Sequence, residues 1–197
     1  MAKGPQYNLP FRRRREGRTD YKSRRRLVIS GIPRLVIRPT NKNMHVQIIK
    51  AEPVGDDVLV SAQSSELKAL GWKAACGNMP AAYLTGLLIG TRAKTKGVNN
   101  VILDIGLSAR GPGSRIFAVA KGALDGGLAI PIDKKVLPSE DRLRGGHIVS
   151  YSKLISNQPE VYKKRFAGYL KNNLKPEELQ ENFTNVQAKI TAPGASK

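Results

Sequence analysis

One segment near the amino terminus limits most strongly what this chain can fold into, because it carries too much charge to enter a hydrophobic core. The segment from Arg12 to Leu27 reads RRRREGRTDYKSRRRL and holds nine basic residues against the two acids Glu16 and Asp20. Its net charge of +7 is more than a third of the +19 of the whole chain. Charge of this sign and density repels itself in a compact protein, so we expect it to lie against a polyanion.

Arginine is the main basic residue of this segment, with eight arginines and one lysine. The guanidinium group can bind two phosphate oxygens at once and can stack on an exposed base, which an ammonium group cannot do. We therefore interpret the segment as an RNA-binding arm. The basic residues expected to contact RNA are Arg12, Arg13, Arg14, Arg15, Arg18, Lys22, Arg24, Arg25 and Arg26. Tyr21 stands among them either as a stacking platform for a base or as an anchor on the edge of the folded domain.

Composition supports a nucleic-acid partner and argues against several other classes. The chain has 34 basic and 15 acidic residues, and its pI is near 10.4, so the folded part should also present basic surface. The single cysteine, Cys76, excludes an intramolecular disulfide and is expected to be a small buried residue. No run approaches the roughly 18 apolar residues of a membrane span, and the start lacks the apolar run of a secretory signal. We expect a soluble, cytoplasmic protein without a membrane partner.

Alternating apolar residues predict three antiparallel strands after the basic segment. The runs 32–38 and 44–50 are rich in β-branched residues and are separated by a turn sequence at 39–43, which is typical of a β-hairpin. A third strand is expected at 58–62, after the turn residues 55–57. Together the three strands would form an antiparallel meander.

The pattern then changes to helices alternating with strands. A helix is predicted from Asn78, as its N-cap, to about residue 94, and a buried strand at 101–107. A second helix is expected at 114–125 with Ser114 as its N-cap, and a last strand at 128–132. Gly86 and Gly90 lie four residues apart in the first helix, and this spacing predicts close approach to another backbone, most simply the sheet below.

These elements describe an α/β sandwich with a mixed sheet, in which a three-stranded antiparallel meander is followed by an α-β-α-β sequence. We divide the chain into a basic arm that is extended (residues 1–30), an α/β core domain (31–137) and a helical carboxy-terminal extension and tail (138–197). The extension is expected to include a helix at 159–170 and a short acidic helix from Pro176. The basic arm is expected to be disordered in the free protein and to become ordered on binding.

Motifs for catalysis, cofactors or metals are weak. The glycines at 111 and 113 follow a strand and precede a helix, but Pro112 stands where a Walker loop needs lysine and Ile116 where a dinucleotide loop needs glycine. Neither His45 nor His147 has an obvious catalytic partner. Asp104 is the only carboxylate in the predicted core strands, and it is expected to cap a turn or pair with a cation. We predict no catalytic residue, cofactor, metal ion or small-molecule substrate.

A second basic stretch at 141–152 combines two arginines with Gly145 and Gly146, which would let a backbone come close to RNA or to another part of the chain. Arg142 and Arg144 are therefore candidate RNA contacts, and the alternative is a solvated turn with two surface arginines.

Five segments of the chain resemble, in order, the large-subunit ribosomal protein family that binds 5S ribosomal RNA and is numbered eighteen in bacteria and five in eukaryotes. The resemblance spans residues 11–155. The segments are RRRREGRTDYKSRRRL, RLVIRPTNKNMHVQI, NMPAAYLTGLLIGTRA, LDIGLSARGPGSRIFAVAKGALDGGLAIP and RLRGGHIVSY.

The resemblance implies an α/β sandwich, an arm on 5S rRNA, and placement in the central protuberance of the large subunit, where the protein attaches 5S rRNA to the large-subunit rRNA beside neighbouring ribosomal proteins. It points to RNA contacts by the arm motif and, in the hairpin turn, by Asn41 and Lys42. The chain is longer than bacterial members and lacks the long basic tail of eukaryotic ones, so it is similar to an archaeal type. From the residues alone, an RNA-processing or RNA-modifying enzyme and a non-ribosomal RNA chaperone remain alternatives.

Overall fold

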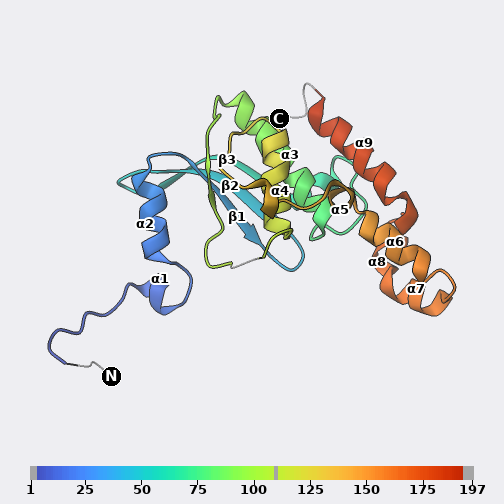
Figure 1. Ribbon diagram of the computed structural model, residues 1–197, viewed down its shortest axis with the longest axis horizontal. Coiled ribbons are helices and arrows are strands. Elements are labelled where there is room, and N and C mark those ends of the chain that lie inside the picture. Colours follow the sequence, from blue (N-terminus) through green and yellow to red (C-terminus); the bar gives the residue numbers. More distant parts are fainter. Residues whose placement is uncertain (1–3, 109–110, 193–197) are drawn as a thin grey trace.

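The predicted meander is confirmed in a computed structural model that describes residues 4–108 and 111–192 (Figure 1). The strands are β1 (Arg34–Pro39), β2 (Met44–Ala51) and β3 (Asp56–Gln63), and each pairs antiparallel with the next. A fourth strand, β4 (Ile102–Asp104), pairs parallel with β1, so the sheet is mixed and has the order β3-β2-β1-β4. The α/β class predicted from the sequence is therefore confirmed.

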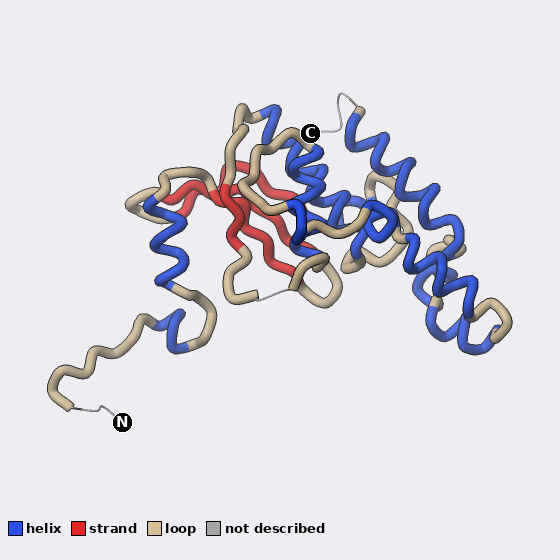
Figure 2. Tube along the Cα trace, in the orientation of Figure 1, coloured by secondary structure: helices blue, strands red, loops and turns tan. Residues whose placement is uncertain are grey.

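Two helices cover one face of this sheet: α3 (Met79–Thr95) and α4 (Arg115–Asp125), shown across the strands in Figure 2. The apolar side chains of Leu35, Ile37 and Ile48 point to this face and are fully buried in one hydrophobic cluster with residues of both helices. The side chain of Asn78 caps α3 as predicted, because it accepts a hydrogen bond from the amide of Ala81.

The glycines of α3 face α4 rather than the sheet, which corrects the prediction. A methyl group at Gly86 would meet the carbonyl oxygen of Val119, and one at Gly122 of α4 would meet the carbonyl oxygen of Tyr83. Each helix therefore places a glycine where the backbone of the other passes. The close approach is therefore a contact between two helices. The residues next to each glycine in the sequence do not indicate which element it approaches.

We expect Gly86→Ala to destabilise the protein by at least about 2 kcal/mol, because the new methyl group would push α4 away from α3 in a tightly packed core. The free energy of unfolding, measured in urea, checks this. Gly168→Ala is the matched control, since a methyl group there would meet nothing within 4 Å. Equal stabilities of the two variants would contradict the packing described above.

The two later strands are shorter than predicted. Only residues 102–104 of the expected strand 101–107 join the sheet. The expected strand at 128–132 is wrong, since it is reduced to one isolated parallel bridge between Asn100 and Ala129. The apolar run still fulfils its packing role, because Leu128 and Ile130 are buried in the core.

The basic arm is helical in part, so its prediction as an extended segment is wrong for residues 12–15 and 21–29. It contains a single turn, α1 (Arg12–Arg15), and a nine-residue helix, α2 (Tyr21–Ile29). In Figure 1 these helices stand at one end of the molecule, and the carboxy-terminal helices lie at the other. The expectation that the arm becomes ordered only on binding concerns the free protein and stays a prediction.

The carboxy-terminal residues form short helices that end in a longer one. Their bounds are α5 (Glu140–Arg144), α6 (Gly146–Leu154), α7 (Pro159–Arg165), α8 (Ala167–Lys171) and α9 (Leu179–Thr191). The single helix expected at 159–170 is thus two helices that meet at Phe166, and the acidic turn at Pro176 leads into α9. The ring of Phe183 in α9 lies 5.6 Å from that of Tyr83 in α3, so α9 packs on the same core as the sheet. No helix within residues 4–108 and 111–192 is long and apolar enough to cross a bilayer.

Candidate nucleic-acid interface

A groove of about 610 Å³ lies between the basic arm and the face of the sheet that α3 and α4 leave uncovered. Residues 34, 36 and 38 of β1 point to this face because side chains alternate along a strand. They line the groove together with residues from β2, β4 and the arm. Six arginines take part, namely Arg13, Arg18, Arg24, Arg26, Arg34 and Arg38. We call this feature the arginine groove.

A chain of alternating charges holds the arm beside the sheet. Arg24 of α2 donates to Asp56 at 2.9 Å, and Asp56 also accepts from Arg34 at 3.0 Å. Arg34 donates in turn to Asp104 at 2.9 Å, and Asp104 accepts from Arg38 at 3.0 Å. The Arg34 and Asp104 side chains are only 4% and 8% exposed, so this central pair is buried while the outer arginines reach solvent.

Asp104 has both of the roles expected from the sequence. It pairs with cations, and its Oδ1 accepts a hydrogen bond at 3.0 Å from the amide of Gly106, which closes the turn after β4. Gly106 has φ of +61°, and a methyl group there would meet the guanidinium of Arg38. The left-handed φ favours glycine at this position, and the missing side chain also leaves room for the Arg38 guanidinium.

Helix α2 has a defined amino-terminal cap. The carboxylate of Asp20 accepts hydrogen bonds from the amides of Lys22 and Ser23 and from the Ser23 hydroxyl. The hydroxyl and amide of Ser23 hold the pKa of Asp20 below its ordinary value, so the cap is charged at neutral pH. The ring of Tyr21 lies 5.0 Å from that of Phe11, which gives it an anchoring contact within the arm.

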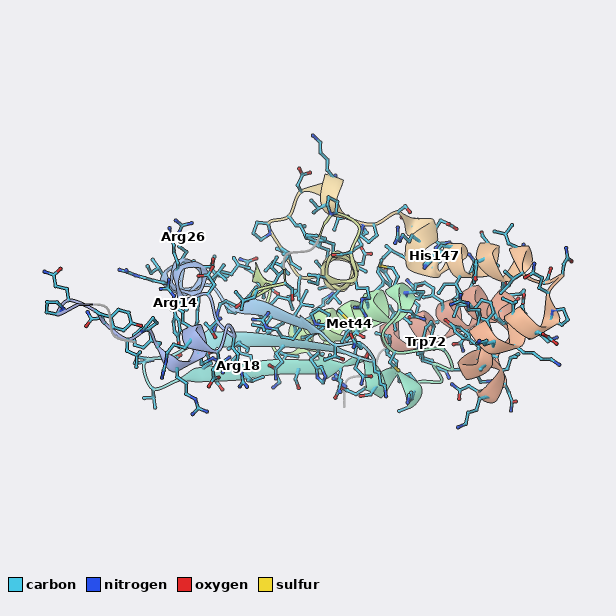
Figure 3. All side chains as sticks on the ribbon, turned by 90° about the horizontal axis from the view of Figure 1, so that it is seen from below. Arg14, Arg18, Arg26, Met44, Trp72 and His147 are labelled. Atoms are coloured by element: carbon cyan, nitrogen blue, oxygen red, sulfur yellow. The ribbon has the colours of Figure 1, made fainter. Side chains whose placement is uncertain are left out.

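Apart from Arg24, the basic residues of the arm divide into two groups. Arg12 and Arg18 pair with Glu16, and Arg13 donates to the Thr19 hydroxyl at 2.8 Å. A second set is exposed and makes no side-chain hydrogen bond or ion pair with any described residue. This set is Arg14, Arg15, Lys22, Arg25 and Arg26. Arg14, Arg18 and Arg26 cluster at the arm end of the molecule, far from His147 (Figure 3). The unpaired cations are available to an external polyanion.

The other predicted contacts lie outside the arginine groove. Asn41 and Lys42 are exposed in the turn between β1 and β2, at the opposite end of β1 from Arg34. Arg142 of α5 lines a separate cavity, and Arg144 pairs weakly with Glu140 at 3.7 Å. A methyl group at Gly145 would meet the side chains of Leu179 and Pro80. This glycine therefore allows close packing within the chain.

Arg34 and Arg38 were not singled out as site residues from the sequence. Their spacing of four within one strand does place them on the same face, so a pattern of period two could have paired them. Nothing local indicates that Asp56 and Asp104 meet Arg34, because these residues are 22 and 70 positions away from it.

The histidines show no catalytic arrangement among the described residues. His45 is exposed on β2, and His147 is exposed at the start of α6. Burial and the nearby charge of Arg142 hold the pKa of His147 below its ordinary value. His147 is therefore neutral at physiological pH and adds nothing to the positive surface.

Comparison with known proteins identifies the family of this chain. A family model described as ribosomal large subunit proteins 60S L5 and 50S L18 matches residues 5–100 and 93–133, which include the arm and all four strands. The large ribosomal subunit protein uL18 of the archaeon Thermofilum pendens is 51% identical over 191 residues, covering 96% of this chain and 97% of that protein. The chain therefore belongs to the family of ribosomal large-subunit proteins that comprises 60S L5 and 50S L18.

Proposed function

We propose that this chain binds 5S rRNA through the basic arm and the arginine groove, and that it helps to attach 5S rRNA to the large-subunit rRNA in the central protuberance. The observation that carries the proposal is the arginine groove itself, in which arginines of the arm and of the sheet face one concave surface. Neighbouring large-subunit proteins would be its other partners, and the assembled subunit would work in the cytoplasm.

The chemistry of the groove suits folded RNA. An RNA double helix hides its bases in a deep and narrow major groove, so its recognition relies on phosphates, 2′-hydroxyls and unstacked loop bases. Planar guanidinium groups bind phosphate oxygens in pairs, and several of them along one concave surface can follow a backbone. The charged chain from Arg24 to Arg38 joins α2 to the sheet, so the exposed Lys22, Arg25 and Arg26 lie on a helix that contacts the folded domain.

Family membership decides between the alternatives that the sequence left open. The family is a structural, non-enzymatic one, so the chain is not an RNA-processing or RNA-modifying enzyme. Asp104, the carboxylate such an enzyme would use, is also committed to Arg34 and Arg38. The structural ribosomal role of the family likewise argues against the hypothesis of a non-ribosomal RNA chaperone.

We expect the purified chain to bind 5S rRNA at least about 100-fold more tightly than transfer RNA at physiological salt, because a specific complex adds fitted contacts to non-specific charge attraction. Filter binding with both RNAs measures this ratio. Sequencing the RNA recovered with the tagged chain from lysate gives an independent readout. Equal affinity for the two RNAs would contradict specific binding of 5S rRNA by this chain.

A further inference from the structure

A carboxylate lines the arginine groove, although the proposed ligand of this groove is a polyanion. Asp56 stands at the start of β3, and its side chain is 30% exposed. Asp104 lines the same groove, but its side chain is buried between Arg34 and Arg38. Like charges that meet at an interface lower its affinity, so the charge of Asp56 alone would oppose RNA binding. Its position in the groove therefore indicates a role other than direct contact with RNA.

Asp56 connects the arm to the sheet through both oxygens of its carboxylate. Oδ2 accepts a hydrogen bond from Arg24 of α2 at 2.9 Å, and Oδ1 accepts one from Arg34 of β1 at 3.0 Å. The Arg34 side chain is buried and also pairs with Asp104, which fixes the position of Asp56 at the wall of the groove. Within residues 4–108 and 111–192, the contact from Arg24 to Asp56 is the only hydrogen bond between the arm and a strand of the sheet.

Helix α2 has no buried residue, so the hydrophobic core does not anchor it. Its three partly buried residues, Tyr21, Arg24 and Leu27, follow one another at intervals of three and therefore share one face of the helix. Val28 and Ile29 at its end are exposed. An isolated helix of nine residues is only marginally stable in water. The place of α2 beside the sheet therefore depends strongly on that single hydrogen bond.

We propose that Asp56 is a positioning residue for RNA binding, because its carboxylate holds α2 on the sheet of the RNA-free chain. Arg25 and Arg26, which are exposed on α2, are then in place before RNA binds. A helix that is already held has less conformational freedom to lose on binding, and this raises the affinity. Arg24 serves as the link within the protein and not as a phosphate contact. The proposal rests on the proposed function for the identity of the RNA.

Hydrogen exchange in the RNA-free chain tests the attachment of α2. Arg24→Gln should speed the exchange of the α2 amides about three- to fivefold, as expected for a partly exposed ion pair in a network, and should leave the β1 amides unchanged. Arg25→Gln is the matched control. It removes the same charge from the same helix, but Arg25 is exposed and pairs with no described side chain. NMR resolves the individual amides. Equal exchange rates of α2 in the two variants would overturn the proposal.

The affinity for 5S rRNA tests the consequence by its sign. Asp56→Asn removes a negative charge from the groove and should nevertheless lower the affinity about three- to fivefold. The slope of log affinity against log salt should stay unchanged, because no phosphate contact is lost. Asp57→Asn removes the same charge from an exposed neighbour and should not lower the affinity. An affinity of Asp56→Asn equal to or above that of the wild type would overturn the proposal.

A double variant tests the role of Arg24. Arg24→Gln combined with Asp56→Asn should bind 5S rRNA as tightly as Asp56→Asn alone, because both changes break one contact. A further loss of affinity, with a salt slope lower by about one, would show that Arg24 binds phosphate and would overturn the proposal. Failure of the proposed function gives a different result, a wild-type chain that does not prefer 5S rRNA over transfer RNA. The exchange measurements contain no RNA, so the two failures are distinguishable.

Discussion

Replacing Arg14, Arg15, Arg25 and Arg26 together with glutamine will weaken 5S rRNA binding by about 100- to 1000-fold at physiological salt. These side chains make no hydrogen bond or ion pair with another described side chain, so their charge is available to phosphates. A dependence of binding on salt arises from counterions released at each neutralised phosphate, with a slope of about 0.7 to 0.9 per contact. The slope of log affinity against log salt should therefore fall by about three.

The control for this variant carries the same change in net charge elsewhere. Lys153, Lys163, Lys164 and Arg165 are exposed on α6 and α7, away from the arm, and their replacement with glutamine should leave 5S binding almost unchanged. Deleting residues 1–26 should have a still larger effect, of several orders of magnitude, because it also removes the contact from Arg24 to Asp56. An unchanged salt slope in the glutamine variant would contradict RNA binding by the arm.

Asp104→Ala will destabilise the fold by about 3 kcal/mol, the lower end of the cost of breaking a buried pair, because the buried guanidinium of Arg34 keeps only the partly exposed Asp56 as a carboxylate partner. It also removes one of the acceptors for Arg38 and the side-chain acceptor for the Gly106 amide. Urea unfolding monitored by circular dichroism measures the loss. Asp57→Ala provides the control, since Asp57 is exposed and accepts no hydrogen bond from a described side chain. The free energy of unfolding of this variant should differ from that of the wild type by less than about 0.5 kcal/mol.

A double variant separates the buried charge from the shape of the site. If the loss arises from the buried charge that Asp56 alone compensates, Arg34→Met combined with Asp104→Leu should be more stable than Asp104→Ala alone, because a buried pair can be replaced by apolar groups with little loss. If the double variant is less stable than Asp104→Ala, the buried charge of Arg34 is not the main cause of the lost free energy of unfolding.

Several parts of the fold were predictable because they depend on neighbours in sequence. The alternation of apolar residues in β1 and β2, the turn between them, and the Asn78 cap of α3 all follow from short-range patterns. The prediction of an extended arm depended on its charge density alone. Asp20 as N-cap and the arginines after it are compatible with a helix, and this local signal outweighed self-repulsion in α2.

The candidate site was predictable only in part. Its basic arm is evident from charge density, but the arginine groove also needs Arg34 and Arg38 on a strand that pairs with β4. Asn41, Lys42 and Arg142 lie outside the arginine groove, and their expected contact with RNA stays a prediction.

By itself the sequence determined that this chain presents a dense cationic segment outside an aliphatic α/β core, since charge density and apolar periodicity are properties of adjacent residues. Only the tertiary structure decided where that segment lies. Asp56 and Asp104 meet Arg34 from distant parts of the chain, Gly86 lies against the backbone of Val119 on another helix, and α9 returns to pack on α3. Such contacts depend on how the whole chain closes around one core, which no short window of sequence records.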